Sequence, residues 1–238
     1  MPPSAADAAA RRAFVAAHTE RVAAPLVPHV HLRLATEVTP LWRATQAWLD
    51  ERELPPPFWA FAWAGGLAVA RAIADGVIDV RGRDVLDLAS GSGLVAIAAA
   101  LAGAARVRAV DLDPFAIAAI ELAAADNGVA VEARVADAVD AVLEPADVVL
   151  AGDVFYDRTI AECMHRALLG AAARGARAFA GDPHRAYAPQ GWEVVLALDV
   201  PTTLDLEGRA SMASRVLAAP SPHAVRAGAG LETSLGGR

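Results

Sequence analysis

A stretch in the middle of the chain has the pattern of one βαβ unit, and it constrains the fold more than any other part. Residues 85–88 are apolar and favour a strand, whereas residues 89–93 are small and form a glycine-containing turn. Strong helix formers occupy residues 94–101. A second apolar run, residues 107–110, ends in Asp111. Such a unit joins two parallel strands through a helix, so we expect an α/β sheet.

The spacing inside this unit predicts a nucleotide site. Asp111 follows Gly91 by about 20 positions, the distance at which a carboxylate at a strand end meets the ribose of a bound nucleotide. Gly91, Gly93 and Ala96 also match the fingerprint of dinucleotide cofactors. Asp87 argues against a dinucleotide, because a carboxylate there would crowd a pyrophosphate. It suits the ammonium and sulfonium groups of S-adenosylmethionine, which we therefore favour over a nicotinamide or flavin cofactor.

The combination of Asp87, the glycine turn and Asp111 resembles the class I methyltransferase pattern. One position departs from it, since this chain has Ala89 where the pattern has its first glycine. If that position requires a positive φ angle, the alanine is strained there.

Composition restricts the protein class. The chain has 238 residues, 55% of them hydrophobic, but no apolar run is long enough to cross a bilayer, and the N-terminus does not resemble a signal peptide. A net charge of −7 disfavours nucleic acid as a partner. The single cysteine, Cys163, excludes an internal disulfide, and we expect no metal site. All 21 residues counted as Lys and Arg are Arg, which is typical of a GC-rich genome. We predict a cytoplasmic, bacterial protein.

The N-terminal part, residues 1–57, is predicted to be an extension that packs on the core. It should contain a helix over residues 5–24, an edge strand over 27–34 and a second helix over 39–49. His29 and His31 lie on one face of the edge strand, but no ligand cluster accompanies them. The core should span residues 58–219, and the tail 220–238 is rich in small residues and expected to be disordered.

Residues 58–66 concentrate aromatic side chains beside two glycines, ahead of a helix expected over 67–74. Core packing explains such a segment. Alternatively, Trp63 lies against an adenine or a target side chain, and Gly65 and Gly66 present N–H groups to a carboxylate.

Further strands are predicted along the rest of the core. The third, residues 131–135, is followed by Asp137 and Ala138, where an acid can accept from an adenine amino group. The fourth, residues 146–151, leads to Asp153 and Tyr156, which we expect in the reacting site because ligands bind outside the carboxyl ends of such strands. The fifth strand is expected over residues 176–180, after a helix over 158–173, and an antiparallel pair over 192–200 and 211–217 closes the sheet. The predicted fold class is thus a doubly wound, Rossmann-like class I methyltransferase sheet, mostly parallel, with an N-terminal helical extension.

Several segments together resemble the electron transfer flavoprotein β-subunit lysine methyltransferases. They are residues 58–66, residues 87–93, Asp111, residues 152–156 and the motif formed by Asp182, Pro183, Arg185 and Tyr187. The likeness spans about residues 14–217. The family belongs to the seven-β-strand methyltransferases, whose members carry an acid-x-x-aromatic motif after the fourth strand. Asp153 and Tyr156 match this motif and are the predicted catalytic residues, which would face the target lysine.

The resemblance also implies a set of cofactor-binding positions. The predicted set is Trp63, Gly66, Asp87, Ala89, Gly91, Gly93, Asp111, Leu112, Asp137 and Ala138. A weaker likeness extends to methyltransferases of ribosomal stalk-associated proteins, which usually have Asn where this chain has Asp153. For Asp182, Arg185 and Tyr187 the sequence offers a substrate contact or an ion pair within the loop as equal alternatives.

The sequence therefore predicts a protein-lysine methyltransferase that acts on the electron transfer flavoprotein β subunit. The alternatives are a methyltransferase of a ribosomal protein or a small amine, a nicotinamide-dependent oxidoreductase, and a nucleotide-binding module without catalysis. A second acidic site beside an intact cofactor loop favours an enzyme, because a binding module does not need one. No nucleic acid or membrane partner is expected.

Overall fold

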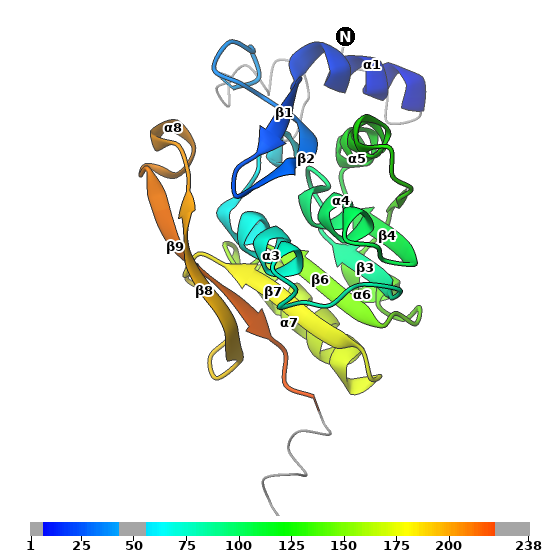
Figure 1. Ribbon diagram of the computed structural model, residues 1–238, viewed down its shortest axis with the longest axis vertical. Helices are drawn as coiled ribbons and strands as arrows, with labels where there is room; N and C mark the ends of the chain where they lie inside the picture. Colours follow the sequence, from blue (N-terminus) through cyan, green and yellow to red (C-terminus); the bar gives the residue numbers. More distant parts are fainter. Residues whose placement is uncertain (1–6, 43–55, 222–238) are drawn as a thin grey trace, which may run out of the picture.

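The computed structural model describes residues 7–42 and 56–221 (Figure 1). A seven-stranded sheet has the order β5-β4-β3-β6-β7-β9-β8. Its strands are β3 (Asp84–Leu88), β4 (Arg106–Asp111), β5 (Glu132–Val135), β6 (Val148–Gly152), β7 (Arg177–Asp182), β8 (Glu193–Pro201) and β9 (Ser211–Ala218). The first five run parallel, and β9 pairs antiparallel with both β7 and β8. The predicted α/β class, the mostly parallel sheet and the closing antiparallel pair are confirmed.

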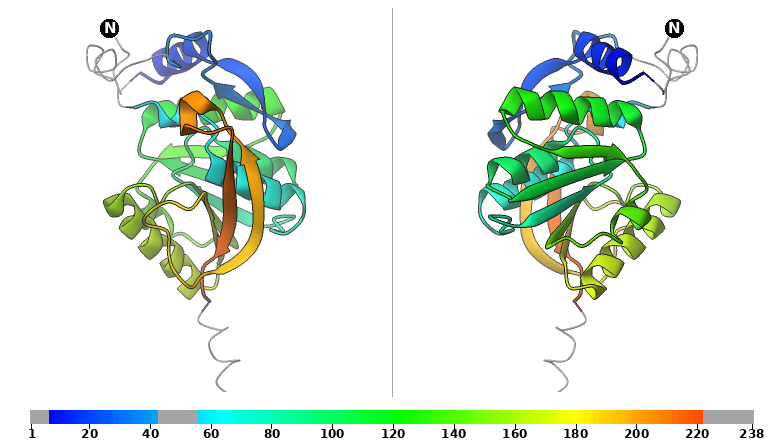
Figure 2. Two further views of the ribbon diagram at one scale, coloured as in Figure 1. Left: turned by 90° about the vertical axis from the view of Figure 1, so that its left-hand side faces the viewer. Right: turned by 90° about the vertical axis from the view of Figure 1, so that its right-hand side faces the viewer.

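Helices cover both faces of this sheet (Figures 1 and 2). The helices are α3 (Ala64–Ala74), α4 (Leu94–Leu101), α5 (Pro114–Asn127), α6 (Ala138–Ala141) and α7 (Arg158–Ala173), with the short α8 (Leu204–Glu207) between β8 and β9. Alternate strand residues enter opposite cores because side chains in a strand point to opposite faces in turn. Val85 packs with α3, α4 and α5, whereas its neighbour Leu86 packs with α6 and α7. Both faces are apolar, as a buried parallel sheet requires.

The helix predicted over residues 5–24 is wrong in its second half. Helix α1 (Ala8–His18) begins after Asp7, whose side chain accepts a hydrogen bond from the Ala10 N–H, and it ends at Thr19 in an extended conformation. Residues beyond form β1 (Glu20–Ala24), which pairs antiparallel with β2 (Val27–Leu34). An alanine-rich run without clear periodicity fits either element, and here pairing with β2 overrides the local preference for helix. The edge strand predicted over residues 27–34 is confirmed as β2.

The extension lies over α4 and α5 (Figure 1). Arg33 of β2 holds Asp126 of α5 with two hydrogen bonds of 2.5 and 2.8 Å. Asn127 of α5 accepts from the His31 N–H and donates to the His31 carbonyl, so β2 is fixed to the end of that helix. Residues 37–42 form turns, and the remainder of the helix predicted over 39–49 lies outside the described residues, as does most of the tail predicted to be disordered.

Helix α3 begins at Ala64, three residues before the predicted start. The two glycines therefore occupy its first turn instead of preceding it. Among the described residues, no helix is long and apolar enough to cross a membrane.

Candidate active site

The turn between β3 and α4 is built on left-handed backbone. Gly91 and Gly93 have φ angles of 53° and 80°, and Gly93 caps the N-terminus of α4. Ala89 also has a positive φ, 48°, although it carries a side chain. The position where the family pattern has glycine thus does need the left-handed region, and the alanine there is strained.

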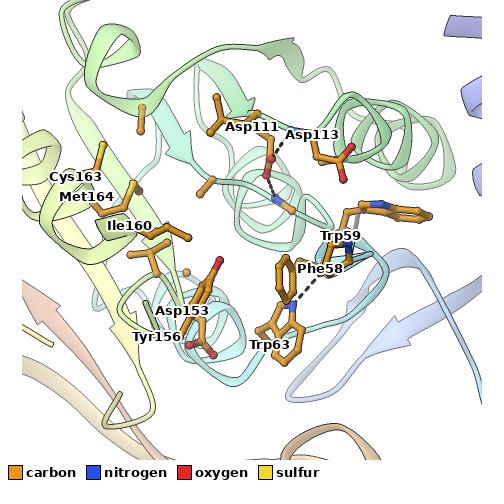
Figure 3. A pocket seen from close by; sticks show the side chains of 18 of the residues that line it. Phe58, Trp59, Trp63, Asp111, Asp113, Asp153, Tyr156, Ile160, Cys163 and Met164 are labelled. Carbon is orange, nitrogen blue, oxygen red and sulfur yellow. Dashed lines mark hydrogen bonds between the residues drawn. The ribbon is translucent and has the colours of Figure 1, made fainter. Parts of the chain in front are cut away.

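Asp111 ties this turn to the end of β4. Its Oδ2 accepts a hydrogen bond of 2.8 Å from the Gly91 N–H, and its Oδ1 accepts one of 2.9 Å from the Asp113 N–H (Figure 3). Burial raises the pKa of Asp111, while the backbone N–H donors oppose that rise. The carboxylate keeps further lone pairs, so it can accept from ribose hydroxyls while it holds the loop.

Asp87 lies beneath the same turn and is buried. Its Oδ2 accepts from the Ser90 hydroxyl and from the Ala96 N–H, the latter at 3.2 Å. Its Oδ1 is buried without a hydrogen-bond partner among residues 7–42 and 56–221. Burial raises the pKa of Asp87 to about 7. A cation nearby would stabilise the ionised form, which agrees with the positive ligand group predicted at this place.

A cavity of about 520 Å³ opens at the carboxyl ends of the parallel strands (Figure 3). Asp111 and Asp113 lie on one side of it, and Asp153 and Tyr156 lie on the other. The residues that line it are Pro56, Phe58, Trp59, Trp63, Ala89, Gly91, Asp111, Leu112, Asp113, Ala116, Ala136, Asp137, Ala138, Gly152, Asp153, Val154, Tyr156, Ile160, Cys163, Met164 and Arg185. The structure therefore brings most of the predicted site residues together.

Three predicted cofactor residues do not line the cavity. Gly66 packs in the first turn of α3, where a β-carbon on Gly152 would approach its Cα to 2.8 Å. Asp87 lies under the turn, and Gly93 begins α4 behind it. Gly66 and Gly93 thus permit close packing of backbone, and a direct contact with the cofactor is not supported for them.

The aromatic segment forms one wall of the cavity. Trp63 donates its indole N–H to the Phe58 carbonyl at 2.9 Å, and the two rings lie 6.0 Å apart. Phe58 also lies 5.8 Å from the ring of Tyr156. Trp59 also lines the cavity, but it is buried and its ring stacks on Phe115 of the core. The segment therefore serves both interpretations, packing at Trp59 and a ligand-facing wall at Phe58 and Trp63.

Asp153 stands directly after β6 with a φ of 58°, another left-handed residue that is not glycine. Its carboxylate is almost fully buried, and Oδ2 accepts from the Gly65 N–H at 3.2 Å. The start of α3 thus does present an N–H group to a carboxylate, but the carboxylate belongs to the protein. Arg185 donates to both oxygens, from Nε to Oδ1 at 2.7 Å and from Nη2 to Oδ2 at 3.0 Å.

For the loop after β7, the sequence left a substrate contact and an ion pair within the loop as equal alternatives. The structure shows ion pairs for Asp182 and Arg185. Arg185 pairs with Asp153 and Glu207, and Asp182 pairs with Arg215 of β9 at 3.0 Å. Each of these three pairs links different elements, so none is confined to the loop. Tyr187 is partly exposed, with the guanidinium of Arg158 5.4 Å from its ring centre.

Sequence reasoning missed several cavity residues. Asp113 caps α5 by accepting from the Phe115 N–H, and burial raises its pKa to about 6. Helix α7 contributes Ile160 and, about one turn later, Cys163 and Met164, on the face toward the cavity (Figure 3). The helical spacing of these three residues was visible in the sequence, but nothing local indicated which face of α7 meets the site.

The residues present fit S-adenosylmethionine. One carboxylate oxygen of Asp87 has no hydrogen-bond partner in the part of the chain that the structure describes, which suits a cationic group nearby, and Asp111 offers a carboxylate for ribose hydroxyls. Asp137 lines the cavity near the end of β5, with one oxygen capping α6 through the Val139 N–H.

Comparison with protein families gives a match over residues 73–155 to ribosomal protein L11 methyltransferase (PrmA). The electron transfer flavoprotein beta subunit lysine methyltransferase of Xenopus laevis is 35% identical over 189 residues, covering 77% of this chain and 74% of that protein. The Mus musculus protein of the same name is 35% identical, covering 73% and 68%. The ribosomal protein L11 methyltransferase of Caldicellulosiruptor bescii is 47% identical over 73 residues, 31% of this chain and 24% of that protein.

Among solved structures, the fold is similar to that of the Thermus thermophilus 16S rRNA methyltransferase RsmC in complex with AdoMet and guanosine. That likeness has a TM-score of 0.51 at 22% identity and covers 68% of this chain and 44% of that one.

Proposed function

Since the chain belongs to the electron transfer flavoprotein beta subunit lysine methyltransferase family, we propose that it methylates lysine side chains of that flavoprotein's beta subunit. The enzyme uses S-adenosylmethionine, and its acceptor is a protein. One observation carries the proposal: a carboxylate and a tyrosine with the acid-x-x-aromatic spacing, Asp153 and Tyr156, line the same cavity as the cofactor turn. An enzyme needs two such sets of groups in one space, whereas a binding module needs only the cofactor set.

The cofactor would be held by the side of the cavity that contains Ala89, Gly91, Asp111 and Asp137. When bound, S-adenosylmethionine supplies an electrophilic methyl group on a sulfonium. Asp111 would accept from the ribose hydroxyls, and Asp137 from the adenine amino group. Asp87 is buried beneath the turn, so its negative charge would act on the positively charged part of the cofactor from below, and its Oδ1 has no hydrogen-bond partner in the described part of the chain.

The opposite side of the cavity would receive the acceptor amine. An amine attacks only when neutral, whereas free lysine has a pKa of about 10.4. The aromatic wall formed by Phe58, Trp63 and Tyr156 would replace water around the amine once the acceptor side chain enters, and this desolvation would favour the neutral amine. Asp153 would orient the amine and stabilise the positive charge that develops on its nitrogen. Methyl transfer is an in-line displacement, so positioning accounts for most of the rate.

Tyr156 has a hydroxyl that stays protonated at neutral pH. Burial raises its pKa above the usual value, and the carboxylates of Asp111, Asp157 and Asp153 raise it further. Its ring, which is partly exposed at the cavity, would pack against the nitrogen of the acceptor once that nitrogen carries charge.

The experiment that tests the proposal mixes the purified protein with radiolabelled S-adenosylmethionine and purified electron transfer flavoprotein. We expect label on the beta subunit, and none on a beta subunit whose lysines are replaced by arginine. Because the methyltransferase contains no lysine, labelled lysine in a hydrolysate comes from the substrate alone. Label on ribosomal protein L11 or on a small amine, with none on the flavoprotein, would reassign the substrate while keeping the reaction class.

The similarity to the L11 methyltransferases lies mainly in the cofactor half. The family match ends at residue 155, before Tyr156 and Arg185. It therefore supports S-adenosylmethionine binding and says little about the acceptor. The cytoplasmic location and bacterial origin predicted from the sequence stay predictions, and so do the domain limits at residues 57 and 219.

A further inference from the structure

Asp153, the carboxylate proposed to contact the acceptor amine, belongs to a cluster of charged side chains. The proposed mechanism gives no role to the other two members of this cluster, Arg185 and Glu207. Arg185 lies between Asp153 and Glu207, a residue of α8 that follows Asp153 by more than fifty positions. Its Nη2 and Nη1 donate to Oε1 and Oε2 of Glu207 at 2.8 and 3.2 Å. Two carboxylates thus share one guanidinium, and four of its five N–H groups are engaged.

The side chains of Asp153, Glu207 and Arg185 are mostly buried. Side-chain exposure is 2% for Asp153, 6% for Glu207 and 22% for Arg185. A buried carboxylate is costly unless it is paired, so the guanidinium stabilises both. The cluster still carries one surplus negative charge. Of the two carboxylates only Asp153 lines the cavity, so the surplus negative charge can stabilise the positive charge that develops on the acceptor nitrogen during methyl transfer.

Arg185 donates to both oxygens of Asp153 through two N–H groups, a bidentate fork that leaves one oxygen able to accept a further hydrogen bond. Oδ2 accepts two hydrogen bonds, from Arg185 and from the Gly65 N–H, whereas Oδ1 accepts, from the described residues, only the one from Arg185 Nε. A carboxylate oxygen has two lone pairs, so Oδ1 can accept one more donor. The planar fork also fixes the rotation of the carboxylate, because both of its contacts must be kept at once.

The loop that carries Arg185, directly after β7, is itself held in place by hydrogen bonds. The Arg185 N–H donates to Asp182 Oδ1 at 2.8 Å, and Asp182 Oδ2 accepts from Arg215 of β9 at 3.0 Å. Asp182 is fully buried. Arg185 is therefore held by its backbone on one side and by Glu207 on the other.

From these contacts we propose that Arg185 is a positioning residue, which sets the rotation of Asp153 so that Oδ1 faces the acceptor amine, with Glu207 as the anchor of Arg185. The inference rests on the proposed function. The proposed role requires both hydrogen bonds from the guanidinium to Asp153, and a positive charge alone does not suffice. This requirement distinguishes positioning of Asp153 from a purely structural role of Arg185.

The test compares Arg185→Lys with Arg185→Met and with the matched control Arg71→Lys. Arg71 pairs with Asp75 on the surface, so its replacement adds the same lysine without touching the cavity. For Arg185→Lys, which keeps the charge but not the fork, we expect thermal stability close to wild type and kcat lowered about 100-fold. The KM for the acceptor protein and the affinity for S-adenosylhomocysteine, by calorimetry, should change less than about threefold, a split that general loss of structure would not give.

Arg185→Met should lower stability as well as kcat, because it leaves two buried carboxylates unpaired. Glu207→Gln keeps the fork on Asp153 but weakens its anchor, and kcat should fall about tenfold or less. Wild-type kcat in Arg185→Lys would overturn the inference, since charge alone would then suffice.

A second outcome would also overturn it. The natural chain has no lysine, so a methyl group on the lysine introduced by Arg185→Lys, read by peptide mass spectrometry against Arg71→Lys, would place this side chain at the acceptor's own position. Absence of methyl transfer by the wild-type protein in the same assay would count against the proposed substrate instead, and the two failures are therefore distinguishable.

Discussion

The carbonyl oxygen of Gly65 lies so close to Gly181 that a β-carbon on Gly181 would come within 1.9 Å of it. A β-carbon on Gly65 would in turn meet the Asp153 N and the Gly181 O at 2.6 Å. The start of α3 thus packs directly on the ends of β6 and β7. This contact brings the Gly65 N–H within hydrogen-bond distance of the Asp153 carboxylate and so helps to fix the position of that carboxylate.

We expect Gly181→Ala to damage the acceptor site, because the added methyl group must push α3 away from β7. Stability should fall by about 2 kcal/mol or more, and methyl transfer should be lost with it. Urea unfolding and the transfer assay measure the two effects. Gly170→Ala is the control, since a β-carbon there has only ordinary contacts with Arg174. It should leave activity intact and stabilise α7 by about 0.5–1 kcal/mol. Equal behaviour of the two variants would contradict the packing argument.

Ala89→Gly should stabilise the protein, because Ala89 has a positive φ that glycine adopts without strain. The gain should be about 0.5–1 kcal/mol after the extra backbone freedom of glycine in the unfolded chain is counted. Gly93→Ala should have the opposite effect, since its β-carbon would also approach Ile120 Cγ1 to 3.0 Å. Thermal unfolding checks both signs, and a lower melting temperature for Ala89→Gly would argue against strain at this position.

Asp87 should make the ligand-free protein less stable as the pH rises. Its pKa is about 7 in the fold and 3.8 in the reference state, so the folded protein binds more protons than the unfolded chain between these values. Stability from this group is present below about pH 4 and is lost as the pH rises through about 7. Its size is on the order of 4 kcal/mol. Asp113, with a pKa of about 6, acts in the same direction.

Asp87→Asn should therefore flatten the pH dependence and raise stability near pH 7. Urea unfolding at about pH 5 and about pH 7.5 measures the difference, with surface Asp75→Asn as the control. An unchanged slope in Asp87→Asn would show that this carboxylate is not the group responsible. The same variant should bind S-adenosylmethionine more weakly, because it lacks the negative charge.

Asp111→Ala should weaken cofactor binding first. The variant loses the two hydrogen bonds that hold Gly91 and Asp113, and it loses the acceptor for the ribose. We expect affinity for S-adenosylhomocysteine to fall about 10- to 100-fold, which is about 1.4–2.8 kcal/mol. Calorimetry measures it directly. Unchanged affinity would place the ribose elsewhere.

Asp153→Ala should have the reverse pattern. Transfer should fall by about 100-fold or more, whereas cofactor affinity is largely kept. The variant should still fold, because Arg185 keeps its pair with Glu207. Loss of cofactor affinity in this variant, by the same calorimetry, would argue against the acceptor role of Asp153.

The local sequence pattern by itself determined the type and bounds of several helices and strands. The ends of α4 and α7 agree with the residues expected from the sequence, and β2 agrees as well, because periodicity and turn residues lie within each segment. The link between Gly91 and Asp111 was foreseeable for the same reason, since a βαβ unit of ordinary length places a turn beside the end of its second strand.

Tertiary structure decided what depends on distant segments. Residues 20–24 look helical in isolation, yet they form β1 because β2 offers a partner. The raised pKa of Asp113 follows from burial, which no local pattern reveals. Arg185 reaches Asp153 and Glu207 only because β6, β7 and the α8 connection end at the same edge of the sheet. Sequence spacing specifies contacts within one supersecondary unit, whereas the contacts that complete the acceptor site arise from the order in which the strands assemble.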